Sequence, residues 1–114
     1  MMPPLSPMRR RGELVALSGH TGGRDGALVG GGFLPELHQV LANLGRVLDE
    51  AGLSKRDVIK VNVYLTDIAD LPRLNQPYAE FFGEPYPART AVAVVALPGG
   101  ARVEIEAWAV ASPR

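Results

Sequence analysis

The sequence contains no cysteine and only two histidines, His20 and His38. The lack of cysteine excludes disulfides, thiolate zinc sites and cysteine nucleophiles. Two histidines are too few for a histidine-rich metal centre, so no metal ion is expected. His20 lies two residues after Ser18, but closeness in the sequence is no sign of a Ser-His-Asp relay.

An excess of charge of one sign is also missing, because 12 basic residues balance 12 acidic ones. No overall field therefore attracts nucleic acid or an anionic membrane, and neither is an expected partner. Three arginines at 9–11 are weak evidence for RNA binding. The apolar run at 14–17 is too short for a signal peptide or a membrane span. A soluble, cytoplasmic protein is the expectation.

No phosphate-binding loop follows from the glycines between Gly19 and Gly32. No Gly-Lys-Ser/Thr comes after them, and no Gly-x-Gly-x-x-Gly opens a helix, so a nucleotide cofactor is not expected.

What is present is an ordinary globular composition, with 46% apolar and 21% charged residues among 114. This length suits one domain, residues 1–114, with residues 1–8 as a flexible lead-in that is rich in proline and methionine.

Periodicity predicts most of the secondary structure. The apolar run at 13–18 predicts a strand, and Asp25-Gly26 predicts a turn into a weak returning strand at 27–29. Leucine and valine at helical spacing predict a helix from Pro35 to a stop at Gly52. Alternation at 57–66 predicts a strand with one apolar face, formed by Ile59, Val61, Val63 and Leu65.

A second helix is predicted between Asp70 and Gly83, but Pro77 lacks an N–H and leaves two possible starts. Either Asp70 caps an early turn, or Asn75 caps a helix that begins near Pro77.

The last two predicted strands, 90–97 and 102–110, are joined by a Pro-Gly-Gly turn. The order is therefore β-β-α-β-α-β-β, which predicts an α+β fold with two helices on one face of a mixed sheet. The helix-strand units imply parallel pairing, and the last two strands form an antiparallel hairpin.

The other sheet face carries Arg102, Glu104, Glu106 and Trp108 from the last strand. Such a mixed face is either solvated or covered by another copy of the chain. The small residues at 90–97 suit close packing and favour self-association.

Candidate chemistry gathers at a few positions. Arg89 begins a strand, where its guanidinium is either a carboxylate ligand or an ordinary surface charge. Glu104 and Glu106 share a strand face, and they either do acid-base work or neutralise Arg102 or Arg89. Ser18-Gly19 ends a strand, either to present a hydroxyl and an N–H to a ligand or simply as a turn.

These residues, taken in order, resemble the Rid family, which is also described as the YjgF or L-PSP endoribonuclease-like group. The similarity covers residues 12–110, and its most specific parts are Pro87-Ala88-Arg89-Thr90 and Glu104-Ile105-Glu106-Ala107. The other matching segments are Ser18-Gly19, Asn43-Leu44, Ala51-Gly52-Leu53, Asp57 to Val61, Leu65-Thr66-Asp67, Asn75, Tyr78 to Phe82, Leu97-Pro98 and Val103.

The resemblance implies a chorismate-mutase-like fold assembled as a homotrimer, with an inner barrel of sheets and a ligand cleft at each subunit interface. It also implies hydrolysis of enamines and imines, such as 2-aminoacrylate, 2-iminopropanoate and 2-iminobutanoate, to 2-oxo acids and ammonia, without metal or organic cofactor. Arg89 would bind the substrate carboxylate, and Glu104 would hold or activate the attacking water. Ser18, Gly19 and Asn75 would line the cleft.

Some positions depart from the family pattern. The tyrosine of the usual segment before the first strand is replaced by Leu5, the usual Ser-Gly-Gln reads Ser18-Gly19-His20, and Ala91 stands where a cysteine is common. Pro77 is unusual within the second helix. The missing tyrosine favours an alternative, a non-catalytic trimer that binds small carboxylates or a member of a specialised pathway. Endoribonuclease or translation-inhibitor activity is the least favoured interpretation.

Overall fold

A computed structural model of the chain describes residues 2–111. Its strands and helices are β1 (Met8–Arg11), β2 (Leu14–His20), β3 (Gly23–Arg24), β4 (Ala27–Leu28), α1 (Phe33–Glu50), β5 (Val58–Leu65), α2 (Leu71–Phe82), β6 (Ala88–Ala93) and β7 (Val103–Val110). Three 3-10 turns lie between them, at Lys55–Asp57, Ile68–Asp70 and Pro98–Gly100.

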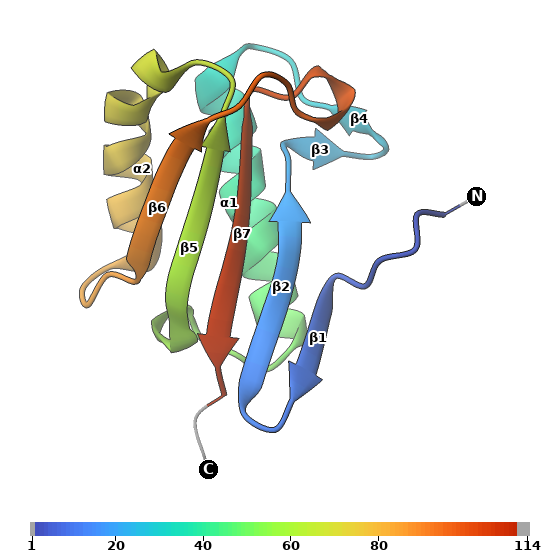
Figure 1. Cartoon of the computed structure of the whole chain (residues 1–114), viewed down its shortest axis with the longest axis vertical. Helices are drawn as coiled ribbons and strands as arrows, with labels where there is room; N and C mark the ends of the chain where they lie inside the picture. Colours follow the sequence, from blue (N-terminus) through green and yellow to red (C-terminus); the bar gives the residue numbers. More distant parts are fainter. Residues whose placement is uncertain (1, 112–114) are drawn as a thin grey trace.

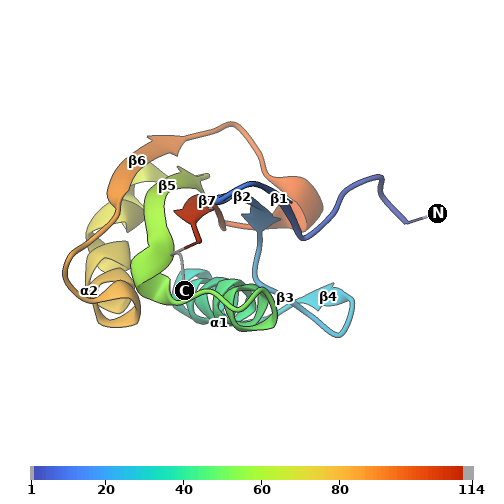
Figure 2. The same ribbon diagram turned by 90° about the horizontal axis from the view of Figure 1, so that it is seen from below.

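Five strands form one sheet in the order β1-β2-β7-β5-β6. The pair β5–β6 is parallel and the other neighbours are antiparallel. Figures 1 and 2 show α1 and α2 on the same face of this sheet. The predicted α+β fold, a mixed sheet with helices on one face, is therefore confirmed. No helix among residues 2–111 is long and apolar enough to cross a membrane.

The apolar faces of α1, β5 and β7 form the core. Leu37 and Leu44 of α1 are fully buried, as are Val63 of β5 and Ile105 of β7. These residues recur at the helical and strand periods that the sequence shows, because each element buries only the face that its period lines with apolar side chains.

The predicted pairing of the first two strands is wrong. The turn forms at Asp25 and Gly26, both with positive φ, but β4 pairs only with β3 in a separate small sheet. Strand β2 pairs instead with β7 on one side and with β1, whose arginines are exposed, on the other. Pairing at this sheet edge uses backbone groups alone, so it requires no apolar pattern, and a row of arginines also discourages further strands from adding.

The predicted C-terminal hairpin is also wrong. The strand β7 lies between β2 and β5, and β6 lies beyond β5 at the sheet edge. The unit β5-α2-β6 is a parallel crossover, which places β6 beside β5 and leaves the other side of β5 for β7. The predicted strand at 90–97 ends early, at Ala93.

Two local predictions are decided by the backbone. The helix α2 begins at Leu71 after Asp70, so the earlier start is correct and Pro77 lies inside the helix. The Asp70 side chain makes no capping hydrogen bond, however, and instead accepts one from Arg73 over 2.9 Å. Ile59 does not join the apolar face: it is 51% exposed, because the β5–β7 register shifts between Val58 and Lys60. A bulge of this kind turns one side chain to the other side.

Candidate functional site

Arg89 lies on the helix-covered side of the sheet. Its register partner in the parallel pair β5–β6 is Val61, which is fully buried beneath the helices. Partners in register place their side chains on the same face. The Arg89 guanidinium accordingly lies over the ring of Tyr78 from α2, with its carbon 4.9 Å from the ring centre.

A pocket of about 290 Å³ opens at this place, between α2 and the start of β6. Its lining combines two aromatic rings with an amide and a guanidinium: Asn75, Tyr78, Ala79, Tyr86, Pro87 and Arg89. The structure therefore brings together Asn75 and Arg89, two of the predicted site residues. A pocket with apolar walls and a few polar groups is the usual form of a small-molecule site.

The Arg89 guanidinium has no carboxylate within ion-pair distance among residues 2–111. The alternative in which Arg89 neutralises Glu104 or Glu106 is therefore not what the chain forms. A planar guanidinium that faces a pocket, with its N–H groups free of protein carboxylates, matches the two oxygens of a ligand carboxylate.

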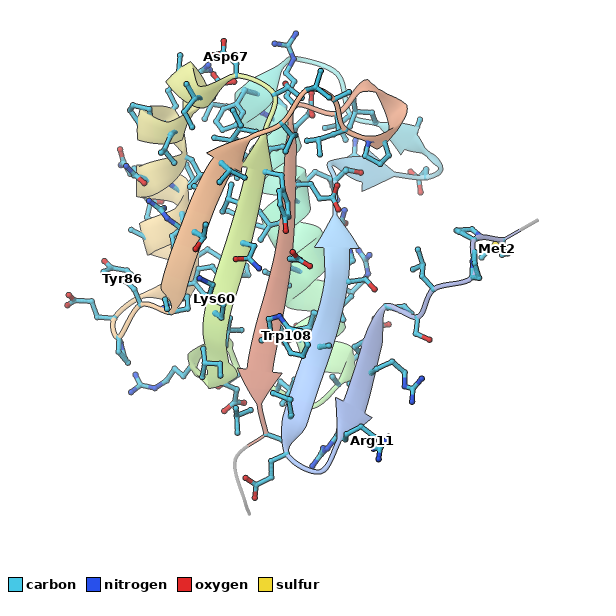
Figure 3. The ribbon with its side chains drawn as sticks, in the orientation of Figure 1. Met2, Arg11, Lys60, Asp67, Tyr86 and Trp108 are labelled. Carbon is cyan, nitrogen blue, oxygen red and sulfur yellow. The ribbon has the colours of Figure 1, made fainter. Side chains whose placement is uncertain are left out.

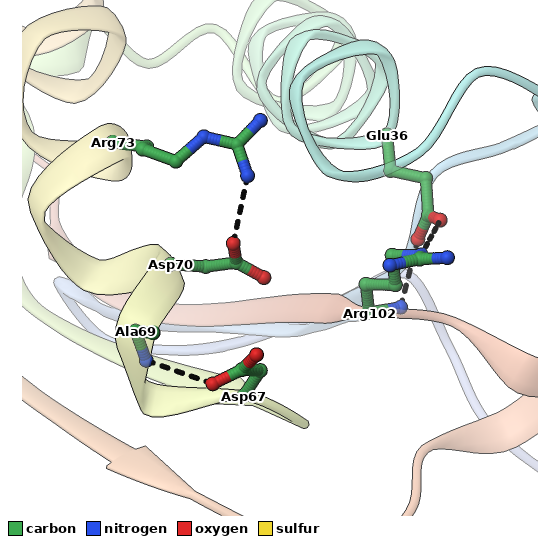
Figure 4. A network of polar contacts seen from close by, with 6 residues as sticks. All are labelled: Glu36, Asp67, Ala69, Asp70, Arg73 and Arg102. Carbon is green, nitrogen blue, oxygen red and sulfur yellow. Dashed lines mark hydrogen bonds and ion pairs between the residues drawn. The ribbon is translucent and has the colours of Figure 1, made fainter.

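Arg102 likewise does not reach the glutamates of β7. Its backbone N–H donates to Oε1 of Glu36 on α1 over 2.8 Å, and its side-chain Nε lies 3.8 Å from Oε2 of the same carboxylate. Figure 4 shows this contact. The side chain of Glu36 is only 3% exposed, so the pair attaches α1 to the start of β7. Sequence reasoning did not identify Glu36.

Glu104 lies on the opposite, open face of the sheet. It is the partner of Tyr64 in the β5–β7 pair, and Tyr64 and Glu104 alternate with buried aliphatic residues. Burial raises the pKa of Glu104, and the negative charge of Glu106 raises it further. A carboxylate with a raised pKa is a better proton acceptor near neutral pH. No described residue donates a hydrogen bond to it within residues 2–111.

Gly19 makes room for Glu104. The β2–β7 register shifts between Leu17 and His20, so the chain bulges at Ser18 and Gly19. A methyl group on Gly19 would lie 3.0 Å from Cδ and 3.2 Å from Cγ of Glu104, and closer still to Oε2. The glycine is therefore required by the close approach of this carboxylate, rather than by a turn.

Glu106 differs from Glu104 although it shares the same face. Its Oε1 accepts hydrogen bonds from the Tyr64 hydroxyl and, over 3.4 Å, from the Asn62 amide. The bond to Glu106 is the main reason that the pKa of Tyr64 is raised. Glu106 is thus held by its neighbours while Glu104 is left open. The alternation of Lys60, Asn62 and Tyr64 in the sequence predicts that these residues share one face of the strand. It does not predict which residues they bind.

Ser18 forms hydrogen bonds with the segment that precedes β1. Its hydroxyl donates to the carbonyl oxygen of Ser6 over 2.6 Å, and its backbone N–H donates to that of Pro7. Ser18 also borders a second pocket, on the open face, with Glu106 and Trp108. Figure 3 shows this open face, with Lys60 and Trp108 lying across it.

The predicted site residues thus fall into two groups on opposite faces of the sheet. Asn75 and Arg89 lie on the helix side, and Ser18, Gly19 and Glu104 lie on the open side. One copy of the chain does not present both groups to one ligand.

Two residues from the comparison with the family pattern, His20 and Asn43, lie outside both groups. His20 is half-buried, and burial together with the charge of Arg46 lowers its pKa. The Asn43 amide donates to the carbonyl oxygens of Thr21 and Gly23, which attaches the turn region to α1. Within residues 2–111 no cluster of three or more His, Asp and Glu side chains is suited to a metal ion.

Comparison with known proteins places this geometry in context. The model of the family described as endoribonuclease L-PSP matches residues 2–111. A RutC family protein of Pyrococcus horikoshii is 42% identical over 108 residues, which cover 93% of this chain and 86% of that protein. A goat 2-iminobutanoate/2-iminopropanoate deaminase is 47% identical over 88 residues, which cover 77% of this chain and 64%, less than two thirds, of that protein.

Solved structures agree. A crystal structure of RidA from an Antarctic Psychrobacter is similar with a TM-score of 0.91 and 38% identity, covering 96% of this chain and 90% of that one. A crystal structure of yeast Mmf1 has a TM-score of 0.92 and 30% identity, covering 98% and 90%.

Proposed function

This chain belongs to the endoribonuclease L-PSP family, also called the Rid family, and from that premise we propose that it hydrolyses 2-imino acids to 2-oxo acids and ammonia. The substrates would be 2-iminobutanoate and 2-iminopropanoate, the latter with its enamine form 2-aminoacrylate. Relatives named 2-iminobutanoate/2-iminopropanoate deaminase, at 41–47% identity, support this reaction.

The observation that carries the proposal is the Arg89 guanidinium at the mouth of the α2–β6 pocket, over Tyr78 and without a protein carboxylate. Both the imino acid and the oxo acid carry a carboxylate next to the reacting carbon. A bidentate pair with Arg89 would fix that carboxylate and therefore the orientation of the C=N bond.

The chemistry then requires water and one proton acceptor. Water adds to the imine carbon as a base takes its proton, and the base passes that proton to the nitrogen. The resulting amino alcohol releases ammonia and leaves the 2-oxo acid. Glu104 suits the base, because its pKa is raised and its carboxylate is not engaged by a neighbour. Glu106 is bonded to Tyr64 and Asn62, and its proposed role is to keep that part of the face in place.

A homotrimer would unite the two groups of residues. Arg89 and Glu104 lie on opposite faces of one sheet, so a ligand in contact with both must lie between two copies. The open face, with Trp108 40% exposed and Val92 42% exposed, is suited to being covered by other copies. Three such faces turned inward would form the expected inner barrel.

The test is the release of 2-oxobutanoate from 2-iminobutanoate that an amino acid oxidase generates in the assay. We expect acceleration over buffer, and a loss of about 100-fold in kcat/KM for Arg89→Ala, since two charge-assisted hydrogen bonds are removed. Arg56→Ala removes an exposed arginine outside both groups and should keep the rate. A wild-type protein with no effect on this imine would refute the proposed reaction.

A second candidate is a non-catalytic trimer that binds small carboxylates, or a member that acts on another imine. It is favoured by Leu5, which is 64% exposed and has no hydroxyl where active relatives are expected to carry a tyrosine. Binding of 2-oxobutanoate, measured by calorimetry, without any turnover of the imine would select this candidate.

Ribonuclease activity is not proposed, because the charge is balanced and only two histidines are present. RNA degradation that persists in Arg89→Ala and Glu104→Gln preparations would identify a contaminant.

A further inference from the structure

The α2–β6 pocket holds hydrogen-bonding groups that the reaction scheme above leaves unused, and the hydroxyl of Tyr86 is one of them. Tyr86 precedes Arg89 by three residues and lines the same pocket. Figure 3 shows it on the loop between α2 and β6. No residue within 2–111 forms a hydrogen bond with its hydroxyl, and the side chain is 51% exposed.

The loop holds Tyr86 in a restricted conformation. Pro85 and Pro87 flank it, and each proline ring sets its own φ. A residue before proline is also confined to extended backbone, so the backbone of Tyr86 has little freedom to move. An aromatic side chain on such a backbone loses little entropy when it orders on a ligand, because only two side-chain torsions remain to be fixed.

Tyr78, the other tyrosine of the pocket, is in a different situation. Its hydroxyl is buried and has no hydrogen-bond partner within the described residues, and its ring supports the Arg89 guanidinium from below. Burial raises the pKa of Tyr78 to about 12, so this phenol stays protonated. Tyr86 is the tyrosine of the pocket that is open to solvent and therefore to an entering ligand.

A bound carboxylate has more acceptor positions than Arg89 can fill. Its two oxygens offer about four lone-pair sites, and a bidentate guanidinium uses two. We propose that the Tyr86 hydroxyl donates a hydrogen bond to the carboxylate that Arg89 binds, which makes Tyr86 a second binding residue for the carboxylate of the substrate. This inference rests on the proposed function, since it assumes that the ligand of this pocket is a small carboxylate.

The experiment compares wild type, Tyr86→Phe and Tyr86→Ala in two measurements: calorimetric titration with 2-oxobutanoate, and imine turnover. We expect Tyr86→Phe, which removes only the hydroxyl, to weaken the Kd about five- to tenfold. KM should rise by a similar factor while kcat stays within about twofold, because the bond is present before and during the reaction. Thermal unfolding checks that both variants are folded, which the exposure of Tyr86 favours.

The outcomes separate the two proposals. Wild-type protein that binds 2-oxobutanoate or turns over the imine, together with an unchanged Tyr86→Phe, overturns the role of Tyr86 alone. A loss in Tyr86→Ala that Tyr86→Phe does not share assigns the effect to the ring and also overturns it. Wild-type protein that neither binds nor turns over overturns the proposed function, and the role of Tyr86 with it.

Discussion

Adding a methyl group at Gly19 should move the carboxylate of Glu104 without changing its chemical identity, and so it tests whether the position of Glu104 matters for turnover. In Gly19→Ala the new Cβ would lie 3.0 Å from Cδ and 3.2 Å from Cγ of Glu104, with Oε2 closer still. These distances are shorter than ordinary van der Waals contact, so one of the two groups must move. The far end of a glutamate side chain moves more easily than the backbone of a five-stranded sheet, so the carboxylate is displaced by roughly 1 Å.

The expected effect on the rate is large and the effect on stability is small. If Glu104 holds or activates water at a fixed distance from the imine carbon, a displacement of roughly 1 Å costs about 100-fold in kcat. Alanine in a strand is favoured over glycine by about 0.5–1 kcal/mol, which offsets part of the crowding. The thermal midpoint should therefore stay within a few degrees while turnover falls.

The assay is imine turnover for wild type, Gly19→Ala, Glu104→Gln and the double variant. Because Gly19 is predicted to act through Glu104, the double variant should be no slower than Glu104→Gln alone. Gly45→Ala is the matched control: its new Cβ would lie 3.4 Å from the Phe81 ring, an ordinary contact, inside α1. It should keep the rate. A Gly19→Ala protein with wild-type kcat would refute the catalytic requirement for the position of Glu104.

Three further predictions concern ionisable groups. Burial, and then the charge of Glu106, raises the pKa of Glu104, so the ionised carboxylate destabilises the folded state once the pH exceeds the ordinary carboxyl pKa of 4.5. In urea unfolding, Glu104→Gln should therefore be more stable than wild type at neutral pH but not below pH 4.5. An equal gain in stability at both pH values would contradict this. Burial, and secondarily Arg46, lowers the pKa of His20 below 6.5, so the histidine binds a proton in the unfolded chain at a higher pH than in the folded one. Wild type should therefore lose stability as the pH falls through 6.5. His20→Gln should lose less stability over the same range. Glu36→Ala leaves the Arg102 N–H without its buried acceptor and should cost about 1–3 kcal/mol in denaturant unfolding, whereas Glu36→Gln keeps an acceptor oxygen and should cost less.

Several parts of the site follow from local sequence patterns. The alternation along β7 separates Val103 and Ile105 from Glu104 and Glu106, and the structure keeps this division of faces. The helical period of α1 likewise identifies the residues that it buries. These properties are local, because a strand or a helix repeats its direction every few residues whatever it packs against.

Pairing and close approach are not local properties. Nothing in the arginines at 9–11 predicts a strand, because an edge strand needs only backbone partners. The place of β7 beside β5 depends on the crossover through α2, which puts β6 on the other side of β5. The contact of Arg102 with Glu36 joins residues 66 positions apart. The position of Tyr86 in the pocket of Arg89 likewise depends on how the loop between α2 and β6 folds.

Arg89 and Glu104 illustrate the division best. Their types and their places on strands were readable from the sequence alone, and so was their resemblance to a family. Only the tertiary structure showed that they lie on opposite faces of one sheet, because the face of a residue in β6 depends on its register with β5. Register is set by long-range hydrogen bonds, and a shift of one residue would have placed Arg89 on the same open face as Glu104.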